Sequence, residues 1–411
     1  GVNYAIAPYK NNTTRLLRWN YYTTAAGTND IAAASTFLTA KGYTIKKNGF
    51  AGSIGFAGTL NTNDAGESIT ITDGGNDPGG NRWNLIGSPY TAALKGGNST
   101  PANQTNTFLR VNIDAGNLDP MKAGVYLWNG SLPYDIKSVD DDFFIAPGQA
   151  FFVHAPDNGG TSANFTEAMQ THQTGNIFLK NAKSYPEIIL RLSNDKSNVL
   201  TKIRYIEGKT TGLDIGSDVG TFTAESSNFN IFSHLLSNSE GADFAIQALP
   251  NNNYENMIIP IGIDAETENE ITFSTTMNNF PEGLKVYLED KKNNTFTRID
   301  ETNSDYKITL DKAQNGIGRF YLHTTSKALS IDKNETLKNI SVYKLNNSTL
   351  RIAGLTKEKT ELSVYNLLGK QVFNSSFTTN GIKDIALPNF TKGVYLVQLK
   401  TISGKISKKI V

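Results

Sequence analysis

The four histidines are the first residues to examine for catalytic or metal-binding chemistry. They are His154, His172, His234 and His323, and no two lie within four residues of each other, so the chain has no His-x-x-x-His motif. No Gly-x-Ser-x-Gly turn marks a nucleophilic serine. A Ser-His-Asp triad stays open, because its members need not be close along the chain. We interpret each histidine as a strand or loop residue and predict that the protein is not an enzyme.

Acidic side chains form three clusters that could offer oxygen ligands to calcium, which prefers carboxylate and carbonyl groups. They are Asp140-Asp141-Asp142 with Asp135 nearby, Asp73 with Asp77, and the loop Asp214 to Asp218. The first two do not fit the spacing of an EF-hand loop. We interpret the Asp140 run as a solvated loop ahead of a strand. We therefore predict no cofactor, with calcium as the alternative.

Two other kinds of chemistry find little support in the spacing of residues. Gly208-Lys209-Thr210 matches the end of a phosphate-binding loop, but Ile203 stands where that loop needs its first glycine. We interpret this segment as a junction between a strand and a turn. The two carboxylates of a glycoside hydrolase need a defined separation in space, which a sequence does not give. A hydrolase built from distant carboxylates is the least favoured interpretation.

Aromatic side chains are the better indication of function. They are concentrated in the first part of the chain and include Trp19, Trp83, Trp128, Tyr21, Tyr22, Tyr90 and Tyr126. A planar ring exposed on a β-sandwich can stack on the face of a sugar, although burial in a core is the more frequent fate of a large aromatic residue. Trp83 and Trp128 are the residues that we predict for glycan binding.

Composition narrows the class of protein. The chain has 411 residues, of which 38% are hydrophobic and 10% aromatic, which is enough to build cores. A net charge of +1 argues against a nucleic-acid partner, and the absence of cysteine excludes disulfides and cysteine-based zinc sites. No run of about 18 apolar residues predicts a membrane-spanning helix. Gly1-Val2-Asn3-Tyr4 does not begin a signal peptide, so we expect an export signal to have been removed or the chain to be a fragment.

The pattern of strands predicts an all-β protein of tandem β-sandwich domains, jelly-roll or Ig-like. Residues 1–178 carry short apolar segments between turn clusters, among them Leu16-Leu17, Ile54-Gly55-Phe56 and Phe108 to Val111, with one helix expected at Asp30 to Ala40. Residues 179–327 carry strand after strand without long helical patterns, which predicts a second sandwich. The mostly polar residues 328–337 are interpreted as a linker.

Residues 338–411 read as a small β-domain that ends on the last residue. Apolar and polar residues alternate at Leu350-Arg351-Ile352 and Leu362-Ser363-Val364, as a strand with one buried face requires. Turns are predicted at Gly369, Asn380-Gly381, Lys392-Gly393 and Ser403-Gly404, where glycine accepts a positive φ. Val394 to Leu399 is expected to be a central strand. The closing strand, Lys405 to Val411, carries lysines that can protect a sheet edge.

This C-terminal region resembles the type A C-terminal sorting domain of the type IX secretion system. The resemblance rests on Ser363 to Val372, Leu387 to Phe390, Lys392 to Val397, Gly404-Lys405 and Lys408 to Val411. The family's Tyr-Pro-Asn-Pro sequence is absent, since Lys344 follows Tyr343. The resemblance implies that this region is a C-terminal Ig-like sorting domain, folded as a β-sandwich. It also implies that the protein is exported across the outer membrane of Bacteroidota to the cell surface or the extracellular space.

The same resemblance implies partners and signal residues. The partners are the outer-membrane translocon and its shuttle protein, with a surface sortase that attaches cargo to lipopolysaccharide as a further partner. Gly369, Gly393 and Gly404 would set the turns, and Tyr395, Val397 and Ile410 would hold the core. Lys405, Lys408 and Lys409, next to the terminal Ile410 and Val411, would be available to a partner.

Three upstream segments carry a second resemblance, to segments that precede such sorting domains in large Bacteroidota surface proteins. They are Arg82 to Tyr90, Val125 to Gly130 and Pro147 to Val153. This resemblance implies a β-sandwich module without a settled activity. We therefore expect an exported, non-enzymatic surface protein. The alternative is a surface adhesin or carbohydrate-binding protein carried by the same signal.

Overall fold

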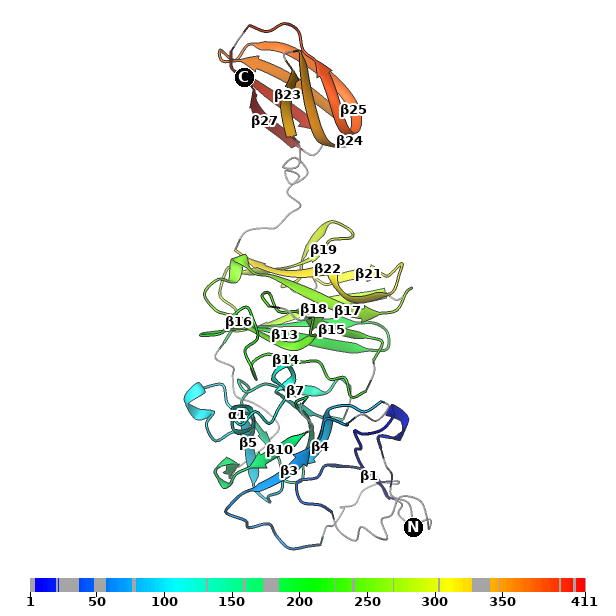
Figure 1. Ribbon diagram of the computed structural model, residues 1–411, viewed down its shortest axis with the longest axis vertical. Coiled ribbons are helices and arrows are strands. Elements are labelled where there is room, and N and C mark those ends of the chain that lie inside the picture. The colour runs from blue at the N-terminus through cyan, green and yellow to red at the C-terminus, as the bar shows by residue number, and fades with distance from the viewer. Residues whose placement is uncertain are drawn as a thin grey trace. The chain divides into compact units, whose positions relative to one another are not determined.

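The computed structural model describes most of the chain, and all statements below concern these residues. They are 4–19, 21, 37–47, 57–75, 79–130, 132–157, 160–172, 185–225, 227–238, 241–268, 270–301, 304–326, 341–346, 348–391, 393–401 and 404–410. The chain divides into two compact units, Gly1–Ala328 and Leu329–Val411. Both are built almost entirely from strands, as predicted (Figure 1). No helix in the described ranges is long and apolar enough to cross a membrane.

The first part of unit 1 consists of small sheets. One has the order β4-β9-β6-β7, one has the order β11-β5-β8, and two are pairs, β1-β2 and β10-β3. The strands are β1 (Tyr4–Pro8), β2 (Tyr43–Lys47), β3 (Glu67–Ile71), β4 (Trp83–Gly87), β5 (Ala93–Gly97), β6 (Val125–Leu127), β7 (Asp135–Lys137), β8 (Phe143–Ile145), β9 (Ala150–His154), β10 (Thr161–Phe165) and β11 (Gln170–Thr171). Most of these strands contribute side chains to one apolar core, which includes Leu94, Phe151 and Phe165.

Two predictions for this part are wrong. Phe108 to Val111 belongs to the helix α1 (Phe108–Asp114) instead of a strand, because the Thr107 hydroxyl accepts a hydrogen bond from the Arg110 N–H at 3.3 Å and caps it. Leu16-Leu17 lies in a short 3-10 helix, Arg15–Leu17, and both leucines are exposed. Ile54 to Phe56 and most of the expected helix at Asp30 to Ala40 lie outside the described residues, and the end of that segment is a turn with Ala40 at φ 60°.

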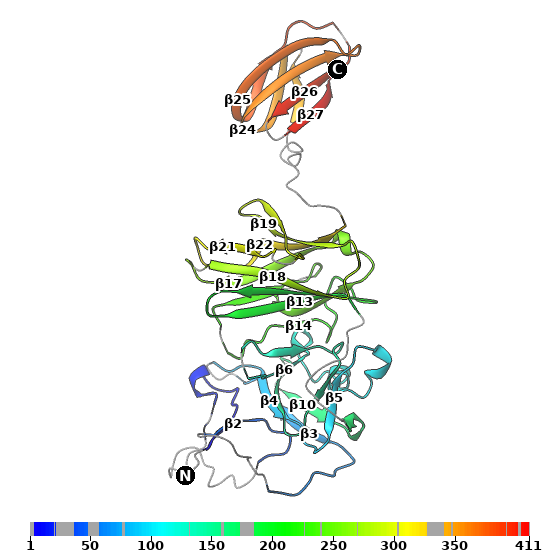
Figure 2. The same ribbon diagram turned by 180° about the vertical axis from the view of Figure 1, so that it is seen from behind.

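The second part of unit 1 is one sheet of eleven strands that folds over a single core. The sheet has the order β20-β19-β22-β17-β15-β16-β13-β12-β18-β21, with β14 paired to β16. The strands are β12 (Glu187–Ser193), β13 (Asn198–Ile206), β14 (Val219–Gly220), β15 (Asn230–Ser233), β16 (Phe244–Pro250), β17 (Ile258–Ala265), β18 (Glu270–Asn278), β19 (Lys285–Asp290), β20 (Thr295–Arg298), β21 (Tyr306–Thr309) and β22 (Gln314–Thr325). Strands from both halves of the sheet contribute to one core, which makes it a two-layered sandwich (Figure 2). Every strand predicted here from apolar alternation is present.

A smaller apolar cluster joins the two parts of unit 1. Trp83 and Tyr126 from the first part pack with Val219 and Ile246 from the second. The predicted boundary at residue 178 and the predicted linker 328–337 both lie outside the described residues. The remaining short 3-10 helices are Pro101–Asn103, Pro120–Lys122, Glu167–Met169 and Tyr254–Asn256.

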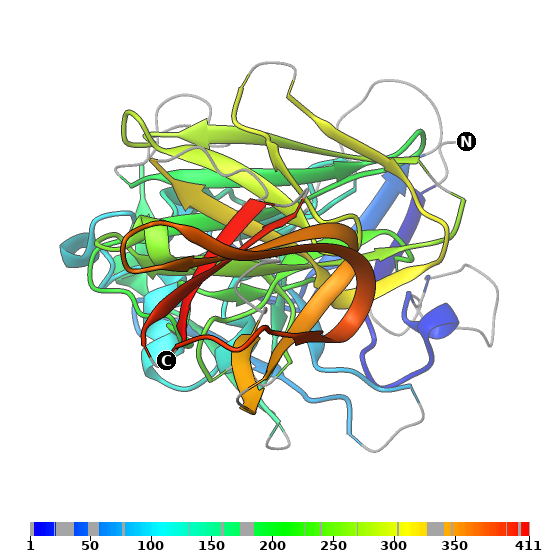
Figure 3. The same cartoon turned by 90° about the horizontal axis from the view of Figure 1, so that it is seen from above.

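Unit 2 is a five-stranded sheet whose longest strand bends to form two layers. The strands are β23 (Ser341–Asn346), β24 (Thr349–Asn366), β25 (Gln371–Ala386), β26 (Tyr395–Thr401) and β27 (Gly404–Ile410), and the sheet order is β23-β24-β26-β27 with β25 paired to β24. One end of β24 pairs with β23, and the other end pairs with β26. Both ends contribute to one core, through Leu350 and Ile352 at one end and Leu362 and Val364 at the other. Figure 3 shows the curved β24 and β25 in orange and dark orange.

The bend explains one wrong prediction, and the strand order confirms another. Asn380-Gly381 is not a turn between two strands but lies within β25, where Gly381, at φ 84°, stands opposite Leu355 and the pairing shifts register. A glycine at a register shift is typical of a β-bulge, which bends a strand. The predicted central strand is confirmed, because β26 lies between β24 and β27.

Candidate functional sites

The outward face of β24, β26 and β27 carries the side chains that a partner of unit 2 could reach. Residues directly opposite each other on neighbouring strands share a face. The register therefore builds three outward rows, Tyr365–Leu396–Lys409, Ser363–Gln398–Ser407 and Glu361–Lys400–Lys405. Leu396 is 44% exposed and lies opposite Lys409. Together these rows form a surface that is both cationic and partly apolar, here called the sorting face.

The three predicted lysines do not share one environment. Lys405 and Lys409 lie on the sorting face, and both line a shallow hollow together with Tyr365, Leu367 and Leu396. Lys408 stands opposite Val397, which is buried, so it lies on the inward face of the edge strand β27. An inward-facing charge on an edge strand blocks pairing with a further strand. Lys405 and Lys409 thus lie on the opposite face of β27 from Lys408.

The remaining predicted signal residues serve turns and core. Gly369 has φ 77° in the turn after β24, where the Asn366 side chain accepts hydrogen bonds from the N–H groups of Leu368 and Lys370, both at 3.0 Å. This turn presents Leu368, which is 93% exposed. The predicted core role of three residues is confirmed, since Val397 and Ile410 are buried in the core of unit 2 and Tyr395 packs against it.

Gly393 and Gly404 lie at either side of β26. Gly393 precedes β26 in a bend, without a positive φ. Gly404 begins β27 and pairs with Thr401, which agrees with a tight return of the chain there. Val411 lies outside the described residues.

Of the two tryptophans predicted for glycan binding, Trp83 is placed in the core. It is 1% exposed, its indole N–H donates to the Thr223 hydroxyl at 3.2 Å, and its ring makes edge contacts with Tyr126 and His154. Trp83 therefore has no face to offer a sugar. Its place in the small cluster between the two parts of unit 1 makes it a packing residue.

Trp128, the second tryptophan, is exposed. It follows β6 and is 52% exposed, and its ring packs against Tyr134 with a centroid distance of 5.2 Å. Tyr134 lies in the loop before β7 and lines a cavity of unit 1. Trp128 is therefore an exposed ring at the margin of a pocket.

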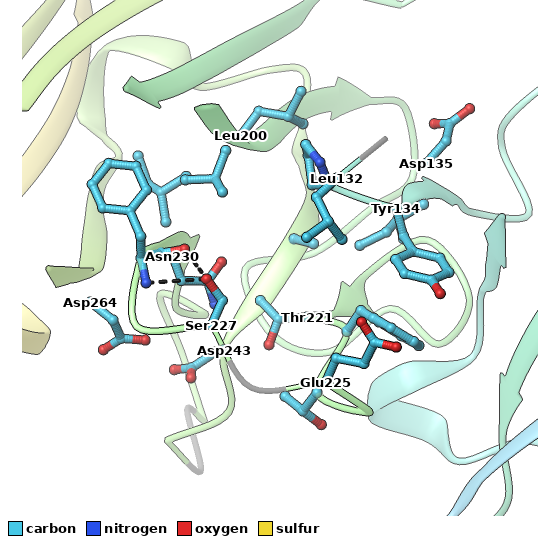
Figure 4. A pocket seen from close by; sticks show the side chains of 18 of the residues that line it. Leu132, Tyr134, Asp135, Leu200, Thr221, Glu225, Ser227, Asn230, Asp243 and Asp264 are labelled. Carbon is cyan, nitrogen blue, oxygen red and sulfur yellow. Dashed lines mark hydrogen bonds between the residues drawn. The ribbon is translucent and has the colours of Figure 1, made fainter. Parts of the chain in front are cut away.

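The cavity has a volume of about 610 Å³ and lies in unit 1, between the β6–β7 loop and strands of the second part. This volume is within the range of small-molecule sites, roughly 300–1,000 Å³. Apolar side chains form much of its lining, among them Leu132, Tyr134, Leu200, Phe222, Phe229 and Ile231. Figure 4 shows Asp243, Asp264, Ser227 and Asn230 on one side and Leu132 and Tyr134 on the other.

The charged groups of the cavity are unequal in number. Four carboxylates, Asp135, Glu225, Asp243 and Asp264, accompany two cationic side chains, Arg15 and Lys202. The Asp135 carboxylate forms an ion pair with Lys137 at 2.9 Å and lies 3.9 Å from the ammonium group of Lys202. Asp243, which lies 2.8 Å from a ring nitrogen of His234, and Asp264 are on one side of the cavity, and Glu225 lies beside Tyr134.

Burial changes the acid–base behaviour of two of these groups. Removal from water lowers the pKa of Lys202 to about 8, against the attraction of the carboxylate of Asp141. Burial, followed by repulsion from Asp243, raises the pKa of Asp264. A carboxyl group with a raised pKa gains from a cation placed beside it, because the cation favours the charged form.

The Asp140 run is not a solvated loop, and this interpretation is wrong. Asp140 and Asp141 are buried, and Asp141 receives two hydrogen bonds, at 2.8 and 3.0 Å, from the guanidinium of the fully buried Arg204 on β13. The same guanidinium donates to Glu187 at 2.9 Å and to the Ser138 hydroxyl at 2.6 Å. The run thus joins the two parts of unit 1 through one charged network.

The other carboxylates considered for calcium have protein donors as well. Asp142 accepts from the N–H and hydroxyl of Ser99, and Asp214 accepts from the N–H of Thr210 at 2.7 Å. Asp73 accepts from the N–H of Gly75, and Asp77 lies outside the described residues. Within the described ranges, no group of three or more His, Asp or Glu side chains is arranged to hold a metal ion.

Three of the four histidines pair with carboxylates. A ring nitrogen of His154 lies 3.0 Å from Asp119, and those of His234 and His323 lie 2.8 Å from Asp243 and Glu289. His154 is buried against Trp83, and burial lowers the pKa of His154 to about 4 even though the hydrogen bond to Asp119 opposes this shift. His172 is exposed, at the end of β11.

Neither the cavity nor the Arg204 network was predicted from the sequence. The cavity residues come from segments as distant as Arg15 and Asp264. One signal was available, since Arg204 and Lys202 are charged residues that alternate with Ile203 and Tyr205 in a strong strand. Such alternation places the charged residues on one face of the sheet and the apolar residues on the other. If the charged face is also buried, its charges need partners from another part of the chain.

Comparison with known proteins gives two family matches. Residues 3–323 match the model of a domain of unknown function (DUF8693). Residues 346–411 match the model of the secretion system C-terminal sorting domain. A search of the curated proteins found no match. The first match spans both parts of unit 1, and the second covers nearly all the described residues of unit 2.

Proposed function

From a chain that belongs to the family of the domain of unknown function DUF8693 and ends in a sorting domain, we propose a non-enzymatic binding module whose ligand is a carbohydrate. The binding site is the cavity of unit 1 with Trp128 at its margin. The protein would act as a surface adhesin or carbohydrate-binding protein.

The sorting signal of this protein lies in unit 2. The chain is a substrate of the type IX secretion system and is exported across the outer membrane to the cell surface or the extracellular space. Its sorting domain implies interaction with the type IX secretion machinery. The sorting face would contact the translocon or its shuttle protein, and a surface sortase would be the further partner.

One observation carries the choice of a carbohydrate. Trp128 is exposed, its orientation is held by Tyr134, and Tyr134 also lines a cavity that contains carboxylate, hydroxyl and amide side chains. A sugar presents an apolar ring face that packs on an aromatic ring and hydroxyl groups that donate to carboxylates. The combination of a held ring and nearby acceptors suits such a ligand.

The test is binding to a glycan array, with the intact chain and the variant Trp128→Ala. We expect the intact chain to bind a defined group of glycans, and the variant to bind them about 3–10-fold more weakly through loss of the stacking contact. Phe37→Ala is the matched control, since Phe37 is 47% exposed and also packs edge-on against one tyrosine, Tyr43. The control should bind as the intact chain does.

Absence of binding by the intact chain would remove the carbohydrate proposal. Equal loss of binding in Trp128→Ala and Phe37→Ala would show that the ring beside the cavity has no special role. Release of new reducing ends from a bound glycan would overturn the non-enzymatic part of the proposal.

A further inference from the structure

We propose that the cavity of unit 1 recognises a glycan that carries protonated amino groups, such as an oligosaccharide of glucosamine. This inference rests on the proposed function and adds the chemical class of the ligand. It is argued from the charged residues of the cavity, whereas the proposal of a carbohydrate ligand is argued from Trp128 and Tyr134.

The first step is the balance of charge across the cavity. The Asp135 carboxylate is already compensated by Lys137 and lies near Lys202. On the opposite side, Asp264 has no ion-pair partner among the described residues, while Asp243 lies 2.8 Å from a ring nitrogen of His234 and repels the charged form of Asp264. A site that holds two repelling carboxylates is stabilised by a cation that binds between them, because the cation relieves the repulsion.

Second, the acidic side of the cavity also carries a polar amide group. Asp264 of β17 stands opposite Asn230 of β15 in the sheet, and both residues line the cavity. The Asn230 amide can donate and accept hydrogen bonds. An amino group between the two carboxylates, with a hydroxyl group beside Asn230, would satisfy these groups.

The third step is the apolar side. Leu132 and Tyr134 line the cavity across from Asp243 and Asp264, and Glu225 lies beside Tyr134. The Tyr134 ring packs against Phe222, which also lines the cavity, and against Trp128. A metal ion would gain nothing from this side, and a small polyamine would leave the aromatic rings uncovered. A ring with an apolar face and an amino group matches both sides at once.

The experiment measures the affinity of the full chain for a glucosamine tetrasaccharide and for its N-acetylated counterpart, by calorimetry at pH 6. The two ligands differ in charge and have the same sugar backbone. We expect the charged ligand to bind about 10–100-fold more tightly, as one or two charge-assisted hydrogen bonds provide. Its binding should weaken with added salt, while the binding of the neutral ligand should not.

Two variants locate the interaction. Asp264→Asn should reduce the affinity for the charged ligand about tenfold and leave that for the neutral ligand unchanged. This variant removes a repulsion with Asp243, so we expect it to stay folded. Asp64→Asn is the matched control, because Asp64 is exposed and lies outside the cavity lining.

The outcomes separate this inference from the proposed function. Equal affinity for both ligands, lost in Trp128→Ala, would overturn the inference and leave the carbohydrate proposal standing. Binding of the charged ligand that is unaffected by Asp264→Asn would overturn the inference, because the attraction would then be unspecific. Binding of a lysine tripeptide with the same dependence on Asp264, and no binding of either sugar, would overturn both in favour of a basic peptide.

Discussion

Arg204 is a buried residue that binds partners from both parts of unit 1. Its guanidinium is buried and bonds Asp141 and Ser138 from the first part and Glu187 from the neighbouring strand β12. Tyr185 lies over the guanidinium at 5.6 Å, and its hydroxyl donates to the Asp140 carbonyl. Loss of one member of such a buried network leaves uncompensated charges, which is costlier than the network's net contribution to stability.

The first prediction follows from this network. Arg204→Met should lower the free energy of unfolding of unit 1 by about 3–5 kcal/mol, since Asp141 and Glu187 would remain buried without their cation. Urea unfolding measures this. Arg191→Met is the control, because Arg191 lies on the neighbouring strand β12 and donates to Thr276 at the surface, where the loss should stay within about 0.5 kcal/mol. Equal effects in the two variants would contradict the network's role.

A second prediction concerns His154 and pH. Its folded-state pKa of about 4 lies below the usual value near 6.5, so the unfolded chain binds more protons between these two values. The stability that depends on neutral His154 is therefore present above about pH 6.5 and is lost as the pH falls toward 4. For this residue alone, the loss between pH 7 and pH 5 is about 2 kcal/mol.

His154→Asn tests this prediction and keeps a donor for Asp119. The variant should be less stable than the intact chain at pH 7, and its stability should fall less between pH 7 and pH 5. Burial raises the pKa of Asp218 to about 7, which makes stability rise as the pH falls, but this effect is common to both proteins and cancels in the comparison. Parallel stability curves for the two proteins would refute the assignment.

At the scale of elements, β27 has two chemically different faces. Its outward residues Lys405 and Lys409 continue the sorting face, and its inward residues Ile406 and Ile410 pack on the core of unit 2. The strand lies at the sheet edge, where Lys408 faces inward. The alternation of a single strand thus places Lys405 and Lys409 on one face and Lys408 on the other.

The third prediction compares the two faces. Lys409→Glu should reduce export several-fold, because it places a negative charge on the sorting face beside Leu396. Lys408→Glu is the matched control, with the same change in charge on the same strand and opposite face, and it should be exported normally. The measurement is the fraction of protein accessible to protease on intact cells. Equal retention of both variants would mean that net charge, not this face, is recognised.

At the scale of the whole molecule, the two units have separate cores. The cores of unit 1 and the core of unit 2 share no residue within the described ranges. Units without a shared core unfold independently, so the sorting domain can remain folded whatever the state of its cargo.

The fourth prediction is that unfolding occurs in two transitions. Leu362→Ala should destabilise unit 2 by about 2–5 kcal/mol, as expected for a fully buried leucine, and leave the transition of unit 1 in place. Leu190→Ala should have the reverse effect, since Leu190 is buried in unit 1. Differential scanning calorimetry of the full chain distinguishes the two transitions. A single transition that shifts in both variants would show that the units unfold together.

The sequence by itself determined the features that depend on neighbouring residues. Alternation at Ile188 to Leu192 and at Leu362 to Val364 predicted strands, and the turn at Gly369 was predicted from one glycine, because strand period and turn geometry are local properties. The sorting domain was identified in the same way, from motifs in fixed order near one end of the chain. A strong local pattern survives in any fold that buries its apolar face.

Only the tertiary structure decided which residues are buried and which meet. Trp83 and Trp128 both stand in or next to apolar strands, yet one is enclosed by Tyr126 and His154 while the other faces solvent. Asp141 was interpreted as solvated because its partner, Arg204, is 63 residues away. Burial and pairing depend on residues brought together from distant segments, so their energies are absent from any local pattern, and the cavity of unit 1 exists only once those segments have packed.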